Sequence, residues 1–175
     1  MKLETERLNI APFTLDLINA ASEKDISKIE ALGFIVNAQW PENDLHEALP
    51  FFKDLLIKNG INGFNSWIIT KKNGNEIVGS IGFIGNPDEN GNTEIGFGII
   101  PDKRRRGYCL ESATAMIKWT FSQKNVSCIK AQCEEGNLAS KSAMEKIGFL
   151  KKECKNGIID WEIRKQQKSD NFNYI

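Results

Sequence analysis

Apolar and polar side chains alternate along several parts of the chain, which is the pattern of strands half-buried in a sheet. This alternation predicts strands at 2–12, 66–70, 76–84, 93–100, 126–133, 149–154 and 158–164. Elsewhere the apolar residues recur at helical spacing. That spacing predicts helices at about 15–21, 26–32, 42–58, 107–123 and 137–146. Strands and helices are therefore interspersed along the whole chain.

Polar turns join the predicted elements. Asn73-Gly74 is a hairpin signal, so residues 64–100 predict a three-stranded antiparallel meander. Pro50 falls inside the third predicted helix and is expected to kink or divide it. The element order predicts an α+β fold around a mixed, mostly antiparallel sheet of about seven strands. Residues 1–165 are expected to form one domain, and residues 166–175 a polar tail.

Residues 94–111 combine a strand, a basic turn and the start of a helix. Pro101 ends the strand because proline has no N–H to donate to a ladder. Lys103 to Arg106 follow, and Gly107 precedes the helical pattern. Free N–H groups and the helix dipole attract anions at a helix start, and arginines add positive charge. The segment lacks the Walker and Rossmann glycine patterns but still predicts an anion site, with phosphate as the expected anion.

Composition narrows the function classes. Lys plus Arg and Asp plus Glu both number 23, so the formal net charge is zero, which gives no support for a nucleic-acid or membrane partner. No segment approaches the roughly 20 apolar residues of a membrane span. The four cysteines have no metal spacing and His46 is the single histidine, so we expect neither a metal site nor a histidine triad. A charged N-terminal segment and free thiols indicate a cytoplasmic protein.

Two stretches resemble the signatures of one enzyme family. The run 104–109, Arg-Arg-Arg-Gly-Tyr-Cys, resembles the acetyl-CoA signature Gln/Arg-x-x-Gly-x-Gly/Ala of the GNAT superfamily of N-acetyltransferases, with Cys109 at the final small-residue position. The stretch from Asn137 to Phe149 resembles Asn-x-x-Ser…Glu-Lys-x-Gly-Phe of the RimJ/RimL-like branch, which acetylates N-terminal amines of ribosomal proteins. The resemblance covers nearly the whole chain. It implies a three-layer α/β/α domain with acetyl-CoA as cosubstrate.

The resemblance also implies where the cosubstrate binds. Backbone N–H groups near Ile99 and Ile100 would polarise the acetyl carbonyl and hold the pantetheine arm as an added strand. Pyrophosphate would lie over the N–H groups from about Arg105 to Cys109, and Asn137 beside the pantetheine arm. A pure capping role for Asn137 is an alternative. The expected cofactor-binding residues are Ile99, Ile100, Arg104, Arg105, Arg106, Gly107, Tyr108, Cys109, Asn137 and Ser140.

This family transfers the acetyl group by direct attack of an amine, so no covalent nucleophile is needed. Glu94 is the candidate general base, acting through water, because it shares a strand face with Gly96 and Gly98; a solvent-facing carboxylate is the alternative. Ser140 is the candidate acid for the leaving thiolate, since Met144 stands where many relatives have tyrosine; a neutral filler is the alternative. Trp40 is the candidate wall of the amine site.

Two residues of the predicted fourth helix have secondary roles. Glu111, in its first turn, is interpreted as a structural residue that complements the helix dipole. Cys109, at the helix start, is interpreted mainly as a small residue near phosphate, with a lowered thiol pKa as a further expectation from its position.

The acceptor and the alternatives stay open at this stage. An amine acceptor could be a protein N-terminus or a small amine, and fold alone does not decide between them. A non-catalytic acyl-CoA-binding module of the same fold is a second class, supported only by the absence of the family's tyrosine at Met144. A nucleic-acid-binding domain using 103–106 is a third class, with no support beyond that run. The protein is expected to be a monomer or a homodimer, with no nucleic-acid or membrane partner.

Overall fold

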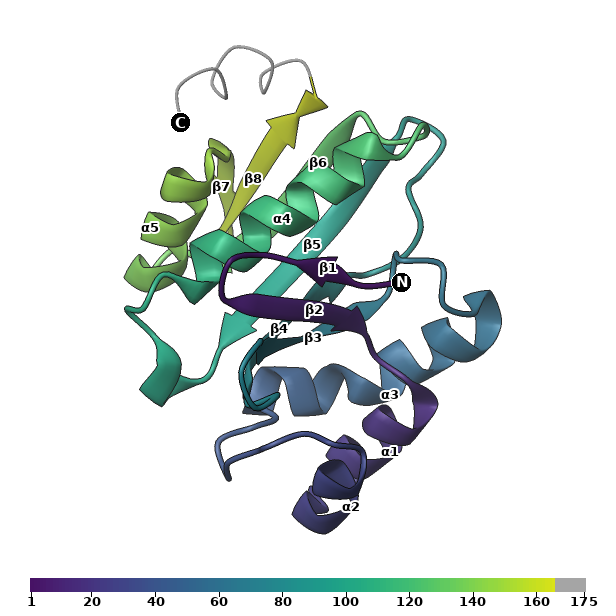
Figure 1. Ribbon diagram of the computed structural model, residues 1–175. Coiled ribbons are helices and arrows are strands. Elements are labelled where there is room, and N and C mark those ends of the chain that lie inside the picture. Colours follow the sequence, from purple (N-terminus) through teal and green to yellow (C-terminus); the bar gives the residue numbers. More distant parts are fainter. Residues whose placement is uncertain (166–175) are drawn as a thin grey trace.

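Eight strands form a single sheet in the order β1-β2-β3-β4-β5-β6-β8-β7 (Figure 1). The computed structural model describes residues 1–165, and the predicted tail lies outside them. The strands are β1 (Leu3–Glu4), β2 (Leu8–Pro12), β3 (Ser66–Lys71), β4 (Ile77–Phe83), β5 (Asn92–Ile99), β6 (Cys128–Glu134), β7 (Leu150–Lys155) and β8 (Ile158–Arg164). The helices are α1 (Leu15–Ser22), α2 (Ile26–Ala31), α3 (Asn43–Asn59), α4 (Tyr108–Ser122) and α5 (Leu138–Ile147). The predicted α+β class is confirmed.

The extra strand arises in the segment 2–12, which was expected to be one strand. Its backbone turns after β1, where the N–H of Thr5 donates to the carbonyl of Leu8 at 3.0 Å. Leu3 then pairs with Ile10, and β2 continues into the sheet against β3. The predicted meander of β3, β4 and β5 is confirmed, with both pairs antiparallel.

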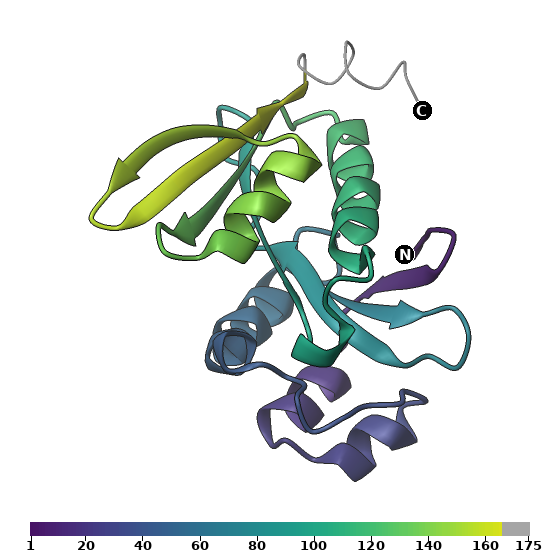
Figure 2. The same ribbon diagram turned by 90° about the vertical axis from the view of Figure 1, so that its left-hand side faces the viewer.

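Apolar side chains cover both faces of the sheet. On one face, residues of α1, α2 and α3 pack against Ile68, Ile77 and Ile100 in one core cluster. On the other face, α4 and α5 pack over a larger cluster that includes Trp67 and Trp161. Figure 2 shows α1, α2 and α3 on one side of the sheet and α4 on the other. The predicted three layers are confirmed.

The sheet divides at the one parallel pair. β5 and β6 are in register only at Asn92 with Cys128, Thr93 with Ile129 and Glu94 with Lys130. Beyond Glu94, β5 continues to Ile99 beside β4 alone within the described part of the chain. One edge of β5 is therefore open over residues 95–99, and this opening positions the site.

The third helix begins close to its predicted start and runs without a break. Pro50 lies inside α3, where a kink or a division was expected. The expected division was wrong, because Asn43–Asn59 is one continuous helix. Pro50 is exposed, so water can solvate the carbonyl that loses its helical donor. The start of α3 lines a cavity together with residues of β4 and β5.

Candidate active site

The N-terminus of α4 presents a row of free backbone N–H groups. Gly107 is the N-cap with φ of 81°, and no side chain caps the helix. Arg105 also has a positive φ, of 60°. Among the described residues, no hydrogen-bond acceptor faces the N–H groups of 105–110. Such groups, with the positive end of the helix dipole behind them, can bind a phosphate.

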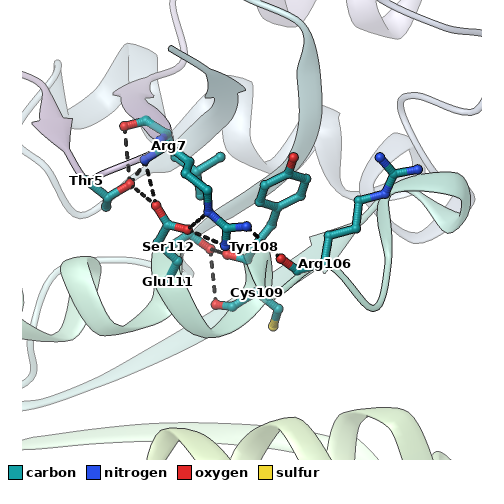
Figure 3. A network of polar contacts seen from close by, with 8 residues as sticks. Thr5, Arg7, Arg106, Tyr108, Cys109, Glu111 and Ser112 are labelled. Carbon is teal, nitrogen blue, oxygen red and sulfur yellow. Dashed lines mark hydrogen bonds and ion pairs between the residues drawn. The ribbon is translucent and has the colours of Figure 1, made fainter. Parts of the chain in front are cut away.

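A polar network ties this N-terminus to the first hairpin, as Figure 3 shows. Glu111 accepts hydrogen bonds from the Thr5 hydroxyl at 2.5 Å, the Arg7 backbone N–H at 2.9 Å and Arg7 Nε at 2.7 Å. Arg7 Nη1 donates to the carbonyl of Arg106 at 2.9 Å, and its guanidinium lies 4.9 Å from the ring centroid of Tyr108. Glu111 thus holds the anion-binding turn in place, in agreement with its structural interpretation.

The three arginines of the turn have different surroundings. Arg104 Nε donates to the carbonyl of Ile99 at 2.8 Å, which fixes this side chain against the end of β5. Arg106 Nη2 donates to the carbonyl of Asp102 at 3.3 Å, and its side chain extends away from the Glu111 network (Figure 3). Arg105 is exposed and has no partner among the residues that the structure describes. Arg105 is therefore the arginine with all its donors available.

The expectation of a lowered thiol pKa at Cys109 was wrong. Burial raises the pKa of Cys109 to about 11, because the side chain packs against the larger core cluster instead of facing solvent. The desolvation of a thiolate outweighs the attraction of the helix N-terminus. Cys109 remains a small residue beneath the turn, and its thiol stays protonated near neutral pH.

The open edge of β5 has its own donors and acceptors. The N–H of Ile100 donates to the carbonyl of Val78 at 3.0 Å, so the expected use of this N–H toward an acetyl group was wrong. Residues alternate between the two edges of a strand, so Ile99 and Phe97 direct their backbone groups away from β4. On that side, the carbonyl of Ile99 already accepts a hydrogen bond from Arg104 Nε. The N–H of Ile99 is thus the available donor at the end of β5.

A cavity of about 310 Å³ lies between α3, the sheet and the start of α5. Its floor consists of small residues in two rows across the strands, because Ser66, Gly82 and Gly96 are in register, and so are Ser80 and Gly98. A side chain added at Gly96 would meet no atom within 4 Å. The remaining lining residues are Glu42, Asp44, Leu45, Ala48, Phe52, Ile81, Ile84, Phe97, Arg104, Asn137 and Ser140.

The start of α5 contributes two of the expected residues to this cavity. Asn137 is the N-cap, and its Oδ1 accepts the N–H of Ser140 at 3.0 Å, which accounts for the capping role. Ser140 is half-buried, and its side chain also lines the cavity. Met144, one turn further on, is buried in the core. Ser140 is therefore the residue within α5 that lines the cavity.

Glu94 and Trp40 do not line the cavity. Glu94 is half-buried at the point where β5 and β6 part, opposite Lys130. Burial raises its carboxyl pKa, nearby Asp160 adds to the increase, and Lys130 opposes it. Trp40 is only 3% exposed and packs edge-on against Phe13, with ring centroids 6.1 Å apart. We leave Trp40 out of the proposed site because it belongs to the core beneath α1 and α3.

One residue of the cavity was not predicted from sequence. Glu42 precedes α3 as its N-cap residue, but its carboxylate makes no capping hydrogen bond. Its Oε2 is buried without a hydrogen-bond partner, and its Oε1 would lie 3.3 Å from a Cβ on Gly98. Burial raises the pKa of Glu42, while a hydrogen bond from its own backbone N–H and the charge of Arg104 partly offset this. In the sequence, an acidic residue before a helix indicates only a dipole-complementing role. The position of Glu42 in the cavity could therefore not be predicted from the sequence.

Residues 1–165 contain neither a metal-binding cluster nor a membrane-spanning helix. No group of three or more His, Cys, Asp or Glu side chains in 1–165 is arranged to hold a metal ion. Within the same range, the helices lack the length and apolar character that crossing a bilayer requires.

Comparison with known proteins identifies the family and the fold. The family model of the acetyltransferase (GNAT) domain matches residues 7–150. The N-acetyltransferase YjdG of Bacillus subtilis is 48% identical over 149 residues, which cover 85% of this chain and 89% of that protein. A GNAT-family acetyltransferase structure from Bacillus anthracis has a TM-score of 0.65 at 23% identity, covering 95% and 99% of the two chains. A structure of RimL, a ribosomal L7/L12 α-N-protein acetyltransferase in complex with coenzyme A, has a TM-score of 0.69 at 14% identity, covering 94% and 98%.

The region matched by the GNAT family model includes both the open edge of β5 and the free N-terminus of α4. The chain belongs to the GNAT family of acetyltransferases, as both the family model and YjdG show. It is an N-acetyltransferase.

Proposed function

We propose that the protein transfers the acetyl group of acetyl-CoA directly to a primary amine. The observation that supports this most is the open edge of β5, which ends beside the unpaired N–H groups of 105–110. The residues fit a CoA-type ligand, because an extended amide chain can pair with the open edge while a pyrophosphate meets the helix N-terminus. RimL was solved in complex with coenzyme A, which supports a CoA-type ligand by analogy of fold.

The chain's own groups would bind and orient the cosubstrate. The N–H groups of 105–110 would hold the pyrophosphate, with Arg105 adding positive charge. Asn137, which lines the cavity beside Ser140, would contact the pantetheine arm. The N–H of Ile99 would donate to the acetyl carbonyl oxygen and stabilise the negative charge that develops there. Acetyl-CoA itself supplies an activated thioester carbonyl.

Two side chains would handle protons. Glu94 would take a proton from the acceptor ammonium through water, since its raised pKa makes it a better base than an exposed carboxylate. Attack by the amine nitrogen forms the C–N bond and breaks the C–S bond. Ser140 would protonate the departing thiolate and regain its proton, through water, from the attacking nitrogen. Glu94→Gln is expected to lower kcat without weakening CoA binding, whereas an equal loss of both would contradict this role.

The acceptor class is open to a small amine or a protein N-terminus. RimL, which is similar to this chain in fold, acetylates a ribosomal protein, L7/L12. The resemblance of 137–149 to the RimJ/RimL-like signature supports the N-terminal version. The cavity of about 310 Å³ has room for one end of either acceptor.

The test is release of CoA thiol from acetyl-CoA across an acceptor panel. The panel contains N-terminal peptides, polyamines, amino acids and aminoglycosides, beside a calorimetric titration with CoA alone. A blank without acceptor is required, because the exposed Cys154 also reacts with thiol reagents. Turnover with one class would support the proposal. CoA binding without turnover on any acceptor would favour a binding module, and absence of CoA binding would refute the proposal.

A further inference from the structure

We propose that Glu42 is the recognition residue for the acceptor, and that it binds the acceptor as a cationic ammonium carried on an apolar stem. This inference rests on the proposed function and adds a specificity residue to it. Glu42 belongs to neither of the two signature stretches, and its position in the cavity comes from the packing of α3 over the sheet.

No other described residue donates a hydrogen bond to the Glu42 carboxylate, whose contacts are with its own backbone N–H and the charge of Arg104. Its Oε2 is buried and unpaired, and none of the ion pairs between described residues involves Glu42. It does not cap α3. A buried carboxylate oxygen without a hydrogen-bond donor is unfavourable, and such groups in folded proteins are normally satisfied. A structural role therefore does not account for Glu42.

The Glu42 carboxylate lies close to the end of β5. Oε1 lies over the β5 face at Gly98, next to the strand end where Ile99 directs its N–H to the open edge. Gly98 is one residue from Ile99, so an amine hydrogen-bonded to Glu42 would be near the carbonyl that Ile99 would bind. The glycine at 98 leaves room for this approach, since a Cβ there would already crowd Oε1 at 3.3 Å.

The cavity around Glu42 combines a net negative charge with apolar walls. Asp44 is a second carboxylate lining the cavity, and Arg104 is the one cation that lines it. Arg104 keeps its positive charge while its Nε donates to the carbonyl of Ile99, but two carboxylates against one guanidinium still leave the cavity negative for a cationic guest. Leu45 and Phe52 of α3 line the cavity as well. These walls suit an apolar stem behind the ammonium group.

Glu42 and Glu94 then have separate functions. Glu42 holds the ammonium group within the cavity, whereas Glu94, outside it on the same sheet face, receives the proton through water. Loss of Glu42 should raise KM for the amine, and loss of Glu94 should lower kcat. This division separates the two carboxylates experimentally.

The test uses CoA-saturated full-length protein and two probes, n-butylammonium chloride and n-butanol, followed by NMR shifts of the Gly96 and Gly98 amides. Wild type is expected to prefer butylammonium over butanol, and Glu42→Gln should weaken butylammonium binding about ten- to hundredfold, the range for a charge-assisted hydrogen bond. Glu47→Gln is the matched control, because Glu47 is exposed on the same helix and does not line the cavity. It should leave both affinities unchanged.

A stability measurement keeps the test independent of folding and of turnover. Because Glu42→Gln removes an unpaired charge, its Tm without ligand should equal or exceed that of wild type, with CoA affinity unchanged. A lower Tm would assign Glu42 a structural role and overturn the inference. So would a wild type that does not prefer butylammonium, or a preference that survives in Glu42→Gln. CoA binding in all variants would keep a failure here distinct from a failure of the proposed function.

Discussion

Gly96 gives the sharpest test of where the reaction occurs. It lies in the middle of β5 on the cavity floor, it is exposed, and a Cβ built there meets no atom within 4 Å. Its φ is outside the positive region that only glycine favours, so Gly96→Ala should not destabilise the fold. Removing glycine flexibility from the unfolded chain should instead stabilise the protein by about 0.4–1 kcal/mol, or leave its Tm unchanged.

Activity should respond in the opposite direction. Side chains of increasing size at 96 enter a cavity of about 310 Å³ on the face where the acyl group and the amine are expected to meet. A displacement of about 1 Å from reactive geometry costs roughly a hundredfold in rate. We expect kcat/KM for the acceptor to fall about tenfold in Gly96→Ala and about a hundredfold in Gly96→Val, and the latter equals about 2.7 kcal/mol of transition-state stabilisation.

The assay is steady-state acetyl transfer to the acceptor found in the panel, with Tm measured on the same samples. Gly136→Ala is the control, because a Cβ at Gly136 also meets nothing within 4 Å and Gly136 does not line the cavity. It should keep wild-type activity. Full activity in Gly96→Val, with an intact fold, would refute the assignment of this face to catalysis.

Two further predictions concern the turn that precedes α4. Glu111→Gln should lower stability at pH 7 by about 1–2 kcal/mol, because its partly buried side chain loses charge-assisted bonds from Arg7. Burial alone would raise the pKa of Glu111, but hydrogen bonds from Thr5 and Arg7 lower it below its ordinary value of 4.5. The extra stability of wild type over Glu111→Gln should therefore be complete above pH 4.5 and disappear as the pH falls through the folded-state pKa of Glu111. Urea unfolding of both proteins at pH 7 and pH 3 measures this difference in stability. An equal difference at the two pH values would contradict the role of Glu111. At pH 8 a thiol reagent should label the exposed Cys154 well before Cys109, whose pKa is about 11, and peptide mass spectrometry showing equal labelling rates would contradict that burial.

Local patterns predicted most of the fold. The Asn73-Gly74 turn and the alternation on either side of it defined the β3–β4 hairpin, and helical spacing placed α4 within a residue or two of Tyr108–Ser122. The start of α4 was also predictable as a basic turn with free N–H groups, because Gly107 and the flanking arginines are contiguous in sequence. These features depend on neighbours along the chain, which sequence reports directly.

Features that depend on tertiary packing were not predicted. Cys109 was expected at an exposed helix start, but the core beneath α4 buries its side chain. Ile100 was expected to offer its N–H to a ligand, but that N–H donates to the carbonyl of Val78 in β4. Trp40 precedes a proline in a loop, yet it fills the core against Phe13. Glu42 becomes notable only because α3 directs it over Gly98, some fifty residues later in the chain.

The most direct test of the account is an ¹⁵N NMR titration of the protein with CoA. We expect the amide chemical-shift changes on CoA binding to concentrate on residues 105–110 and on Phe97 and Ile99 at the open edge of β5. Saturation should also slow hydrogen exchange of these amides, because each gains an acceptor that the protein lacks. Absence of shifts at both places, or shifts confined to the exposed face of β7, would contradict the central claim that this opening is the cosubstrate site.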